Sequence, residues 1–536
     1  MRHRTMTAAF LAAGLLVGLA ACGGDDDDAT EPAGADDTAS DDTAADASGD
    51  EATDGGESAA RGGTLKLGII QDLSSWDPSQ AHVGHRLQPY QAPYDTLILR
   101  EPDGTLSPML ATSWEYTDDS RTELSLDLRT DVTFSDGAAF DADAVVANIE
   151  HFMADPGPQV GQSSSIESVS AVDADTVAIT LSEPNPAMEY FLSQALGLMG
   201  SPASLGTDEM DRTPVGTGPY VLVAGESVVG SQYVFEARDG YWNPDLQKWD
   251  RIELRLLSDA TARINAVTTG EVDATLVDAT TFDQAKGAGL DDLIYTVDVQ
   301  GVLIFDRDGT IVPALAEPKV RQAINYAFDR ENLLQQLAAG QGEVTSQFFG
   351  TSTAGYTPEL DTAYSYDPEQ AKALMAEAGY ADGFTMDMPV VPGISDTIMT
   401  FVAQQLGDIG ITVNQVPVQI ADYQGELGSG KFPAAWFSLG QLPAWSSYDF
   451  VVSPDALYNP FDTTTPEEEA LVERMRLGGD DGDAAAKELG QYLVDEAWFA
   501  WWYRPAQLYF YDGSKVSVEA QDGMAVPAIY NYTPAG

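Results

Sequence analysis

The chain has 536 residues, too many for a single hydrophobic core, so two or three domains are predicted. Its 85 acidic and 26 basic residues give a formal net charge of −59. Such a surface repels phosphate backbones, which argues against a nucleic acid as partner. The single cysteine excludes an internal disulfide and any metal site built from several cysteines.

The N-terminus has the layout of an export signal. Arg2 and Arg4 precede an apolar run over residues 8–21 that is too short to span a bilayer and ends in small residues before Cys22. The sequence Leu-Ala-Ala-Cys resembles a bacterial lipobox, which implies removal of a signal peptide of residues 1–21 and attachment of lipid to the sulfur of Cys22. The lipid would hold the protein on the outer face of the membrane. The alternative is an ordinary secretory signal with an incidental cysteine.

Residues 22–60 carry 14 acidic side chains and no basic one, and they contain almost nothing that could form a core. This composition predicts a disordered, self-repelling linker. The rest of the chain still carries 71 acidic and 24 basic residues, a net charge of −47, so the acidity also belongs to the folded part.

Strands and helices alternate in the first part of the folded region. Strands are predicted at residues 61–70 and 123–129, and two more within 168–182, from alternating apolar residues. A helix is predicted from Phe140 onward, with Asp141 or Asp143 placed to cap its N-terminus.

Residues 213–250 predict a tight corner followed by a β-hairpin. Gly216 and Gly218 make the corner, and two apolar runs, 220–223 and 232–237, make the strands. Both glycines are interpreted as structural rather than as ligand contacts.

The second half begins with a strand–helix–strand unit over residues 251–277, which indicates a mixed α/β sheet. One strongly periodic helix is predicted from Lys319 to Leu334, and another over 366–379 with Pro368 in its first turn. Residues 401–406 read as helix and 411–418 as strand. The aromatic run 498–511 is interpreted as a buried strand pair near a domain boundary.

Motifs for catalysis are weak. There is no Gly-x-Ser-x-Gly elbow of a serine hydrolase. Residues 425–431 match most of a phosphate-binding loop, but Phe432 stands where Ser or Thr would bind Mg²⁺. These residues are therefore expected to form an ordinary loop before a strand. His82 and His85 could face one metal ion, but no third ligand is evident. The sequence therefore predicts neither an enzyme nor a metal or cofactor site.

Aromatic residues gather between Phe432 and Phe461 among Gly, Pro, Ser and Asn. In such a loop-rich segment they can stack on a ligand and offer an indole N–H or a phenol. Trp436, Trp445 and Tyr448 are the candidate ligand contacts, although half or more of the aromatics in this segment are expected simply to pack the domain. Trp445→Ala is expected to weaken binding while leaving the melting temperature nearly unchanged.

An ordered series of short motifs carries a family resemblance. It includes GGTLKLG at 62–68, YDTLI at 94–98, VGTGPY at 215–220 and RDGYWN at 238–243. Over residues 61–515 the chain resembles the extracytoplasmic solute-binding proteins of ABC importers, family 5, the peptide/nickel type. The resemblance implies an α/β, two-lobed periplasmic-binding-protein-like fold of class II type, with mixed sheets and an inserted small α+β domain.

The resemblance also implies domain boundaries and a role. Lobe I would comprise 61–93, 213–300 and 505–536, the inserted subdomain 94–212, and lobe II 301–504. A monomer would bind a small solute, such as a peptide or a sugar, with high affinity in the cleft between the lobes. An ABC permease in the membrane would recognise the closed form. His85 and Tyr90 are the candidate ligand contacts from lobe I.

One departure from the family pattern concerns the ligand. Peptide-binding members carry an aspartate that anchors the peptide's α-amino group, in the loop that corresponds here to 440–450. The only acid in this loop is Asp449, a candidate ligand contact that aligns better with a position further along. A buried ammonium without its counter-ion costs several kcal/mol, so a free peptide is disfavoured. Two other classes stay open: a secreted hydrolase or lyase with an unrecognised active site, and a ligand-sensing receptor domain.

Overall fold

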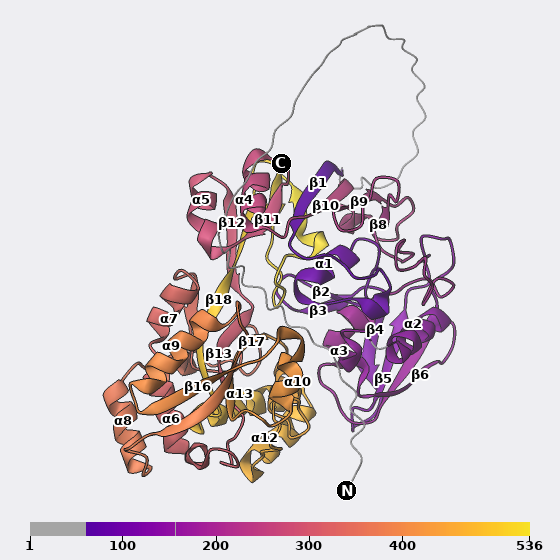
Figure 1. Ribbon diagram of the computed structural model, residues 1–536. Coiled ribbons are helices and arrows are strands. Elements are labelled where there is room, and N and C mark those ends of the chain that lie inside the picture. The colour runs from indigo at the N-terminus through magenta and orange to yellow at the C-terminus, as the bar shows by residue number, and fades with distance from the viewer. Residues whose placement is uncertain (1–60, 156, 536) are drawn as a thin grey trace, which may run out of the picture.

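The computed structural model describes residues 61–155 and 157–535. The predicted signal peptide, the lipidation site Cys22 and the acidic linker lie outside the described residues. The protein has two lobes (Figure 1), and a smaller subdomain lies beside the lobe that contains β1 (Gly62–Ile69). This subdomain contains α2 (Ala142–Ala154) and the strands from β4 (Ala111–Tyr116) to β6 (Ile166–Ala171). This confirms the two-lobed α/β fold expected from the sequence.

One large sheet runs through both lobes. Its strands are β1 (Gly62–Ile69), β8 (Tyr220–Leu222), β9 (Gln232–Ala237), β10 (Trp249–Leu256), β11 (Ala274–Val277), β12 (Asp291–Thr296), β13 (Asp298–Ile304), β14 (Gly342–Val344), β17 (Ala434–Gly440) and β18 (Phe499–Tyr511). The order is β17-β13-β18-β11-β1-β10-β9-β8, and β12 and β14 also pair with β18. β1 lies parallel to β10 and β11, so the sheet is mixed, as the strand–helix–strand unit predicted.

Strand β18 connects the lobes. Its residues 499–505 pair with β13 and β14 in lobe II, and its residues 506–511 pair with β11 and β12 in lobe I. The expectation of a strand pair over 498–511 is therefore wrong, because this is one continuous strand. The segment contains no Gly, Asn or Asp that would favour a turn, and partner strands in the two lobes satisfy its backbone along its length.

The hairpin and its corner confirm the prediction for residues 213–250. β8 and β9 are antiparallel, with Tyr220 opposite Ala237. A Cβ on Gly216 would lie 2.2 Å from the Pro93 carbonyl oxygen, and one on Gly218 would lie 2.5 Å from the Tyr94 nitrogen. Both glycines are thus needed because another stretch of backbone passes against them.

The subdomain consists of a four-stranded sheet and a helix. The sheet order is β4-β5-β7-β6, and α2 packs against β6 and β7. Its N-terminus is capped by Asp141, whose carboxylate accepts a hydrogen bond of 3.0 Å from the backbone nitrogen of Ala144, as predicted. The α-helices and strands of this part of the chain, from α1 to α3, are α1 (Leu87–Tyr90), β2 (Ile98–Arg100), β3 (Leu106–Pro108), β4 (Ala111–Tyr116), β5 (Glu123–Leu128), α2 (Ala142–Ala154), β6 (Ile166–Ala171), β7 (Thr176–Leu181) and α3 (Met188–Phe191).

Helices cover the sheets of lobe II. They are α6 (Pro318–Ala327), α7 (Arg330–Leu337), α8 (Pro368–Glu377), α9 (Asp396–Gly407), α10 (Tyr423–Gly428), α11 (Ala444–Val451), α12 (Pro466–Arg476) and α13 (Gly479–Asp495), beside the parallel pair β15 (Phe384–Val390) and β16 (Ile411–Pro417). Lobe I adds α4 (Ala260–Thr269), α5 (Phe282–Gly287), β19 (Val516–Val518) and β20 (Tyr532–Pro534). No helix in the described part of the chain is long and apolar enough to span a membrane.

The single helix predicted from Lys319 to Leu334 is wrong, because it is broken into α6 and α7. Phe328 adopts an extended backbone and is fully buried, with its ring 5.1 Å from that of Trp502. Asp329 then caps α7 by accepting a hydrogen bond from the Asn332 nitrogen. Core packing of one aromatic side chain and a local cap outweigh the continuous helical periodicity.

The aromatic segment is also more regular than expected. Residues 444–451 form α11 instead of a loop, and Pro443 stands at its N-cap position. Trp445 and Tyr448 lie one turn apart on this helix, with ring centroids 5.7 Å apart. Further along, Tyr458 packs against the rings of Phe437 and Phe450. Much of the segment is therefore core, as expected for half or more of its aromatics.

Candidate functional site

A cavity of about 230 Å³ lies between the two lobes. From the side of lobe I and the subdomain it is lined by Arg100, Gly104, Pro186, Tyr190, Asp522 and Gly523. From lobe II it is lined by the turn 352–354, the segment 441–445 that leads into α11, and the facing parts of α12 and α13. Because both lobes supply walls, the cavity is complete only when they stand close together.

Direct contacts hold the lobes together beside the cavity. Arg476 Nη1 lies 3.0 Å from Glu183 Oε2, which joins α12 to the loop before α3. Ala187, from the subdomain, packs in a hydrophobic cluster otherwise made by lobe II. A Cβ on Gly478 would lie 3.3 Å from Pro186. The lobes therefore meet along this edge of the cavity.

Trp445 is the predicted site residue that lines this cavity. Its side chain is 9% exposed, and the guanidinium carbon of Arg476 lies 5.6 Å from its ring. Tyr448 packs behind it, and burial together with the neighbouring Glu468 carboxylate raises the pKa of its phenol. Trp445 therefore lies in the cavity wall, with Arg476 over its ring and Tyr448 packed against it.

The other predicted contacts lie elsewhere. Trp436, on β17, is 1% exposed and belongs to the core of lobe II. Asp449 is exposed on α11. Tyr90 is fully buried and donates its hydroxyl to the Ser75 carbonyl oxygen. Burial lowers the pKa of His85 to about 4, so its ring is neutral at pH 7. These four residues do not line the cavity between the lobes.

Sequence reasoning missed Arg100, Tyr190 and Asp522. Arg100 ends the short strand β2, Tyr190 lies on α3, and Asp522 comes from the C-terminal segment, so only the fold brings them together. One signal was present in the sequence: a charged residue directly follows the apolar run Leu97–Leu99, which enters the core.

The segment that resembles a phosphate-binding loop is not built for phosphate. Residues 423–428 form α10, and Lys431 Nζ pairs with Glu426 Oε2 at 2.8 Å. Residues 425–428 therefore belong to this helix, and residues 429–431 follow its C-terminal end, where the dipole disfavours an anion. The loop before a strand that was expected over 425–431 is confirmed only for residues 429–431.

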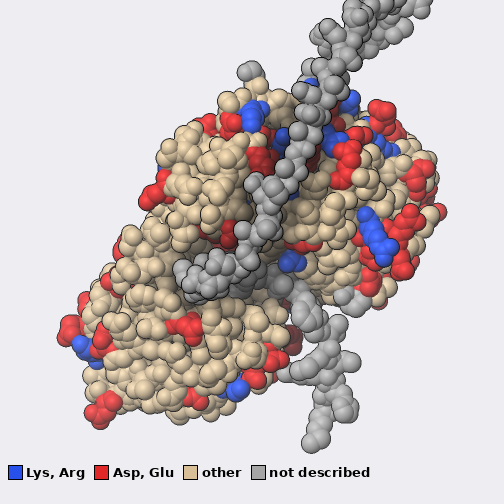
Figure 2. All heavy atoms as spheres, turned by 45° about the horizontal axis from the view of Figure 1, so that its top comes forward, with Lys and Arg blue, Asp and Glu red and all other residues tan. Residues whose placement is uncertain are grey.

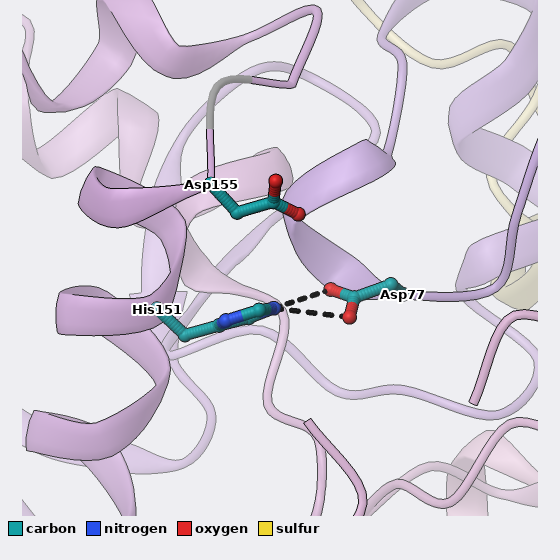
Figure 3. A group of neighbouring side chains, drawn as sticks. All are labelled: Asp77, His151 and Asp155. Atoms are coloured by element: carbon teal, nitrogen blue, oxygen red, sulfur yellow. Dashed lines mark hydrogen bonds and ion pairs between the residues drawn. The ribbon is translucent and has the colours of Figure 1, made fainter. Parts of the chain in front are cut away.

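Within the described residues, one group brings three metal-ligating side chains within 4.8 Å of one another: Asp77, His151 and Asp155 (Figure 3). His151 Nε2 lies 2.9 and 3.0 Å from the two Asp77 oxygens. Asp77 also accepts from the Ser79 and Gly206 backbone nitrogens, and Asp155 accepts from the Ser79 hydroxyl. Burial raises the pKa of Asp77, but these hydrogen bonds and the His151 ring outweigh it and lower that pKa.

The three side chains are thus already engaged with one another and with the protein. They tie the turn around Ser79 to the C-terminal end of α2, and none of them lines the cavity between the lobes. This arrangement explains the cluster as a structural network. His82 does not join it, since its ring pairs with Arg86 Nη1 at 2.9 Å.

A two-lobed α/β fold with a cavity lined from both sides is the architecture of the solute-binding proteins. Over residues 105–463 the sequence matches the family described as bacterial extracellular solute-binding proteins, family 5 (middle). The chain belongs to this family, as the resemblance implied, and it therefore binds a solute outside the cytoplasm for an ABC importer.

Named relatives agree with this assignment. The chain is 29% identical over 415 residues to the glutathione-binding protein GsiB of Pectobacterium atrosepticum, covering 74% of this chain and 77% of that protein. It is 27% identical to heme-binding protein A of Haemophilus influenzae, covering 65% and 68%. The ABC transporter substrate-binding protein CtaP of Listeria monocytogenes has a similar structure, with a TM-score of 0.73 at 22% identity over 89% of this chain and all of that chain.

Proposed function

We propose that the cavity around Trp445 is the solute site and that the lobes open and close about it. The observation that carries this proposal is that both lobes, through Arg100 and Asp522 on one side and Trp445 and Gln441 on the other, line one cavity. A ligand that contacts both walls favours the closed state by its differential affinity. The chain crosses between the lobes at residues 296–298 and 504–506, which we assign as the hinge.

The proposed division of the chain keeps the boundaries expected from the sequence, which lie within a few residues of these crossings. Lobe I comprises 61–93, 213–300 and 505–536, the subdomain 94–212, and lobe II 301–504. The subdomain and lobe I share one hydrophobic cluster, so they move together when the cleft opens. The protein acts as a monomeric binding protein and not as an enzyme, which is consistent with relatives that are named as binding proteins.

Native mass spectrometry of the purified protein tests this function. A solute that stays bound in the gas phase and is released on denaturation supports the proposal, and X-ray scattering in solution should show a smaller radius of gyration with the solute than without it. Catalytic conversion of the recovered solute by the protein would contradict a pure binding role.

We further propose that the protein is held on the outer face of the cytoplasmic membrane by lipid on Cys22. The support is the sequence Leu-Ala-Ala-Cys at the end of a short apolar run. In cells, wild-type protein should fractionate with membranes and Cys22→Ala should be released. Identical fractionation of the two would overturn the lipid anchor and leave the solute site untouched.

A further inference from the structure

Arg100 is a buried cation in the wall of the cavity. It is 9% exposed, it lines the cavity, and its Nε and Nη2 have no hydrogen-bond partner among the described residues. Its guanidinium carbon lies 5.0 Å from the centroid of the Tyr190 ring, a cation–π contact that does not supply a hydrogen-bond acceptor to the enclosed Nε and Nη2. An unpaired buried donor on a charged group is costly, so an acceptor is expected in the functional state.

Other buried arginines in the described part of the chain have partners that Arg100 lacks. Arg504 also has two unpaired nitrogens, but it forms an ion pair of 2.9 Å with Asp361. Arg330 donates to the carbonyl oxygens of Thr345, Trp501, Asn325 and Tyr364 and to the side chain of Asn325. All of its guanidinium nitrogens are satisfied by the protein. Arg100 has no such cage and no ion pair within the described residues, although it is buried to a similar degree.

Asp522 is the acidic neighbour of Arg100 in the cavity, but the two side chains form no ion pair. Burial raises the pKa of the Asp522 carboxyl, although the charge of Arg100 acts to lower it. A second cavity of about 10 Å³ adjoins Arg100, which is space for one water. One water can accept from one or two of the five N–H donors of a guanidinium, so further donors remain for another acceptor.

Resting on the proposed function, we propose that Arg100 binds a carboxylate of the transported solute. A carboxylate matches the planar fork of a guanidinium with two parallel hydrogen bonds. Among the described residues, Arg100 is the one basic residue that lines the cavity, and Asp483 and Asp522 line it as well. This balance favours a singly charged carboxylate over a phosphate dianion. The rings of Trp445 and Tyr190 contact the apolar part of the solute.

Matched acid and amide probes test the assignment without knowledge of the natural solute. The probes are dialanine, 4-hydroxybenzoate and monomethyl succinate, each beside its primary amide, titrated calorimetrically into solute-free wild type, Arg100→Met, Arg100→Lys and Arg474→Gln. Arg474 is a partly exposed arginine that does not line the cavity, so its variant controls for the loss of one positive charge. Melting temperatures show that each variant is folded.

For the wild type and Arg474→Gln, at least one acid should bind about ten-fold or more tightly than its amide. This preference should vanish in Arg100→Met and shrink in Arg100→Lys, which keeps the charge and loses the fork. Any of three results overturns the proposal: the acids and amides bind equally to the wild type, the preference for the acid persists in Arg100→Met, or no acid binds. A neutral solute recovered by native mass spectrometry would also overturn it, while the solute-binding function would stand.

Discussion

Trp436 and Trp445 are close in sequence and similarly buried, yet they have different surroundings. The ring of Trp436 is enclosed by the core of lobe II, whereas that of Trp445 has core on one side and the cavity on the other. Burial alone therefore does not distinguish a structural aromatic residue from one that binds a ligand. The distinction depends on whether the ring is enclosed by core residues or also borders a cavity.

This difference corrects the expectation that Trp445→Ala would leave stability unchanged. At 9% exposure, the truncation should lower the free energy of unfolding by about 3–5 kcal/mol as well as weaken binding. Trp445→Phe is the sharper variant, because it keeps most of the packing and should reduce affinity for the recovered solute about ten-fold. Trp436→Phe is the control and should change stability without changing affinity; calorimetry and thermal melts measure both. An unchanged affinity in Trp445→Phe would remove Trp445 from the site.

The burial of Asp95 makes the free energy of unfolding depend on pH. It is fully buried, and burial raises its pKa to about 6 although Trp242 Nε1 and the Tyr241 hydroxyl donate hydrogen bonds to it. In an unfolded chain its pKa is about 3.9. The folded state therefore binds the proton more tightly, and the contribution of Asp95 to stability falls as pH rises from about 4 to 6.

Asp95→Asn cannot ionise and should lose this pH dependence. Relative to the wild type, its free energy of unfolding should rise by about 2–3 kcal/mol between pH 4 and pH 7. Urea titrations of both proteins at pH 4, 5, 6 and 7 measure the difference, in which the titration of the other carboxylates cancels. A difference that stays constant over this range would show that Asp95 titrates normally.

At the scale of elements, patterns within a few residues of each other were predictable. The hairpin β8–β9 and the Asp141 cap follow from local residue types, and both are present. The break between α6 and α7 was not predictable, because it depends on the packing of Phe328 against Trp502, which is far away in the sequence. The candidate site shows the same contrast. Trp445 was predictable from the local cluster of aromatic residues, while Arg100 and Asp522 were not, because only the fold brings them together.

The corner before β8 offers a matched pair of glycine variants. Gly216→Ala places a methyl group 2.2 Å from the Pro93 carbonyl oxygen and should lower the free energy of unfolding by about 3 kcal/mol or more, because backbone must move. Gly225→Ala, in the hairpin connection, meets nothing within 4 Å and should be neutral or slightly stabilising. Urea unfolding of the two variants measures the contrast. Similar stabilities would mean that the chain near Pro93 yields easily.

For the whole molecule, the main electrostatic feature is an excess of acid. Figure 2 shows acidic side chains spread over the face in view, with fewer basic ones among them. Residues 61–536 carry a formal charge of −47, and mutual repulsion of these charges opposes the compact state.

Screening should therefore stabilise this protein. Raising NaCl from about 10 mM to 500 mM shortens the Debye length from about 30 Å to under 5 Å and should raise the melting temperature by several degrees. Scanning fluorimetry at pH 7 measures the shift, and a neutral osmolyte at equal osmolality controls for effects other than screening. A melting temperature that falls with salt would mean that attractive ion pairs outweigh the repulsion.

Strand β18 has a consequence for the order of events during synthesis. It pairs with strands of both lobes and lies near the end of the chain, so neither half of the sheet can be completed before residues 499–511 have left the ribosome. Contacts of such long sequence separation form late and slowly. The nascent protein consequently cannot fold lobe by lobe as it emerges. The large sheet, unlike the separate sheet of the subdomain, stays incomplete until translation is nearly over, and an incompletely folded polypeptide can still be threaded through a membrane.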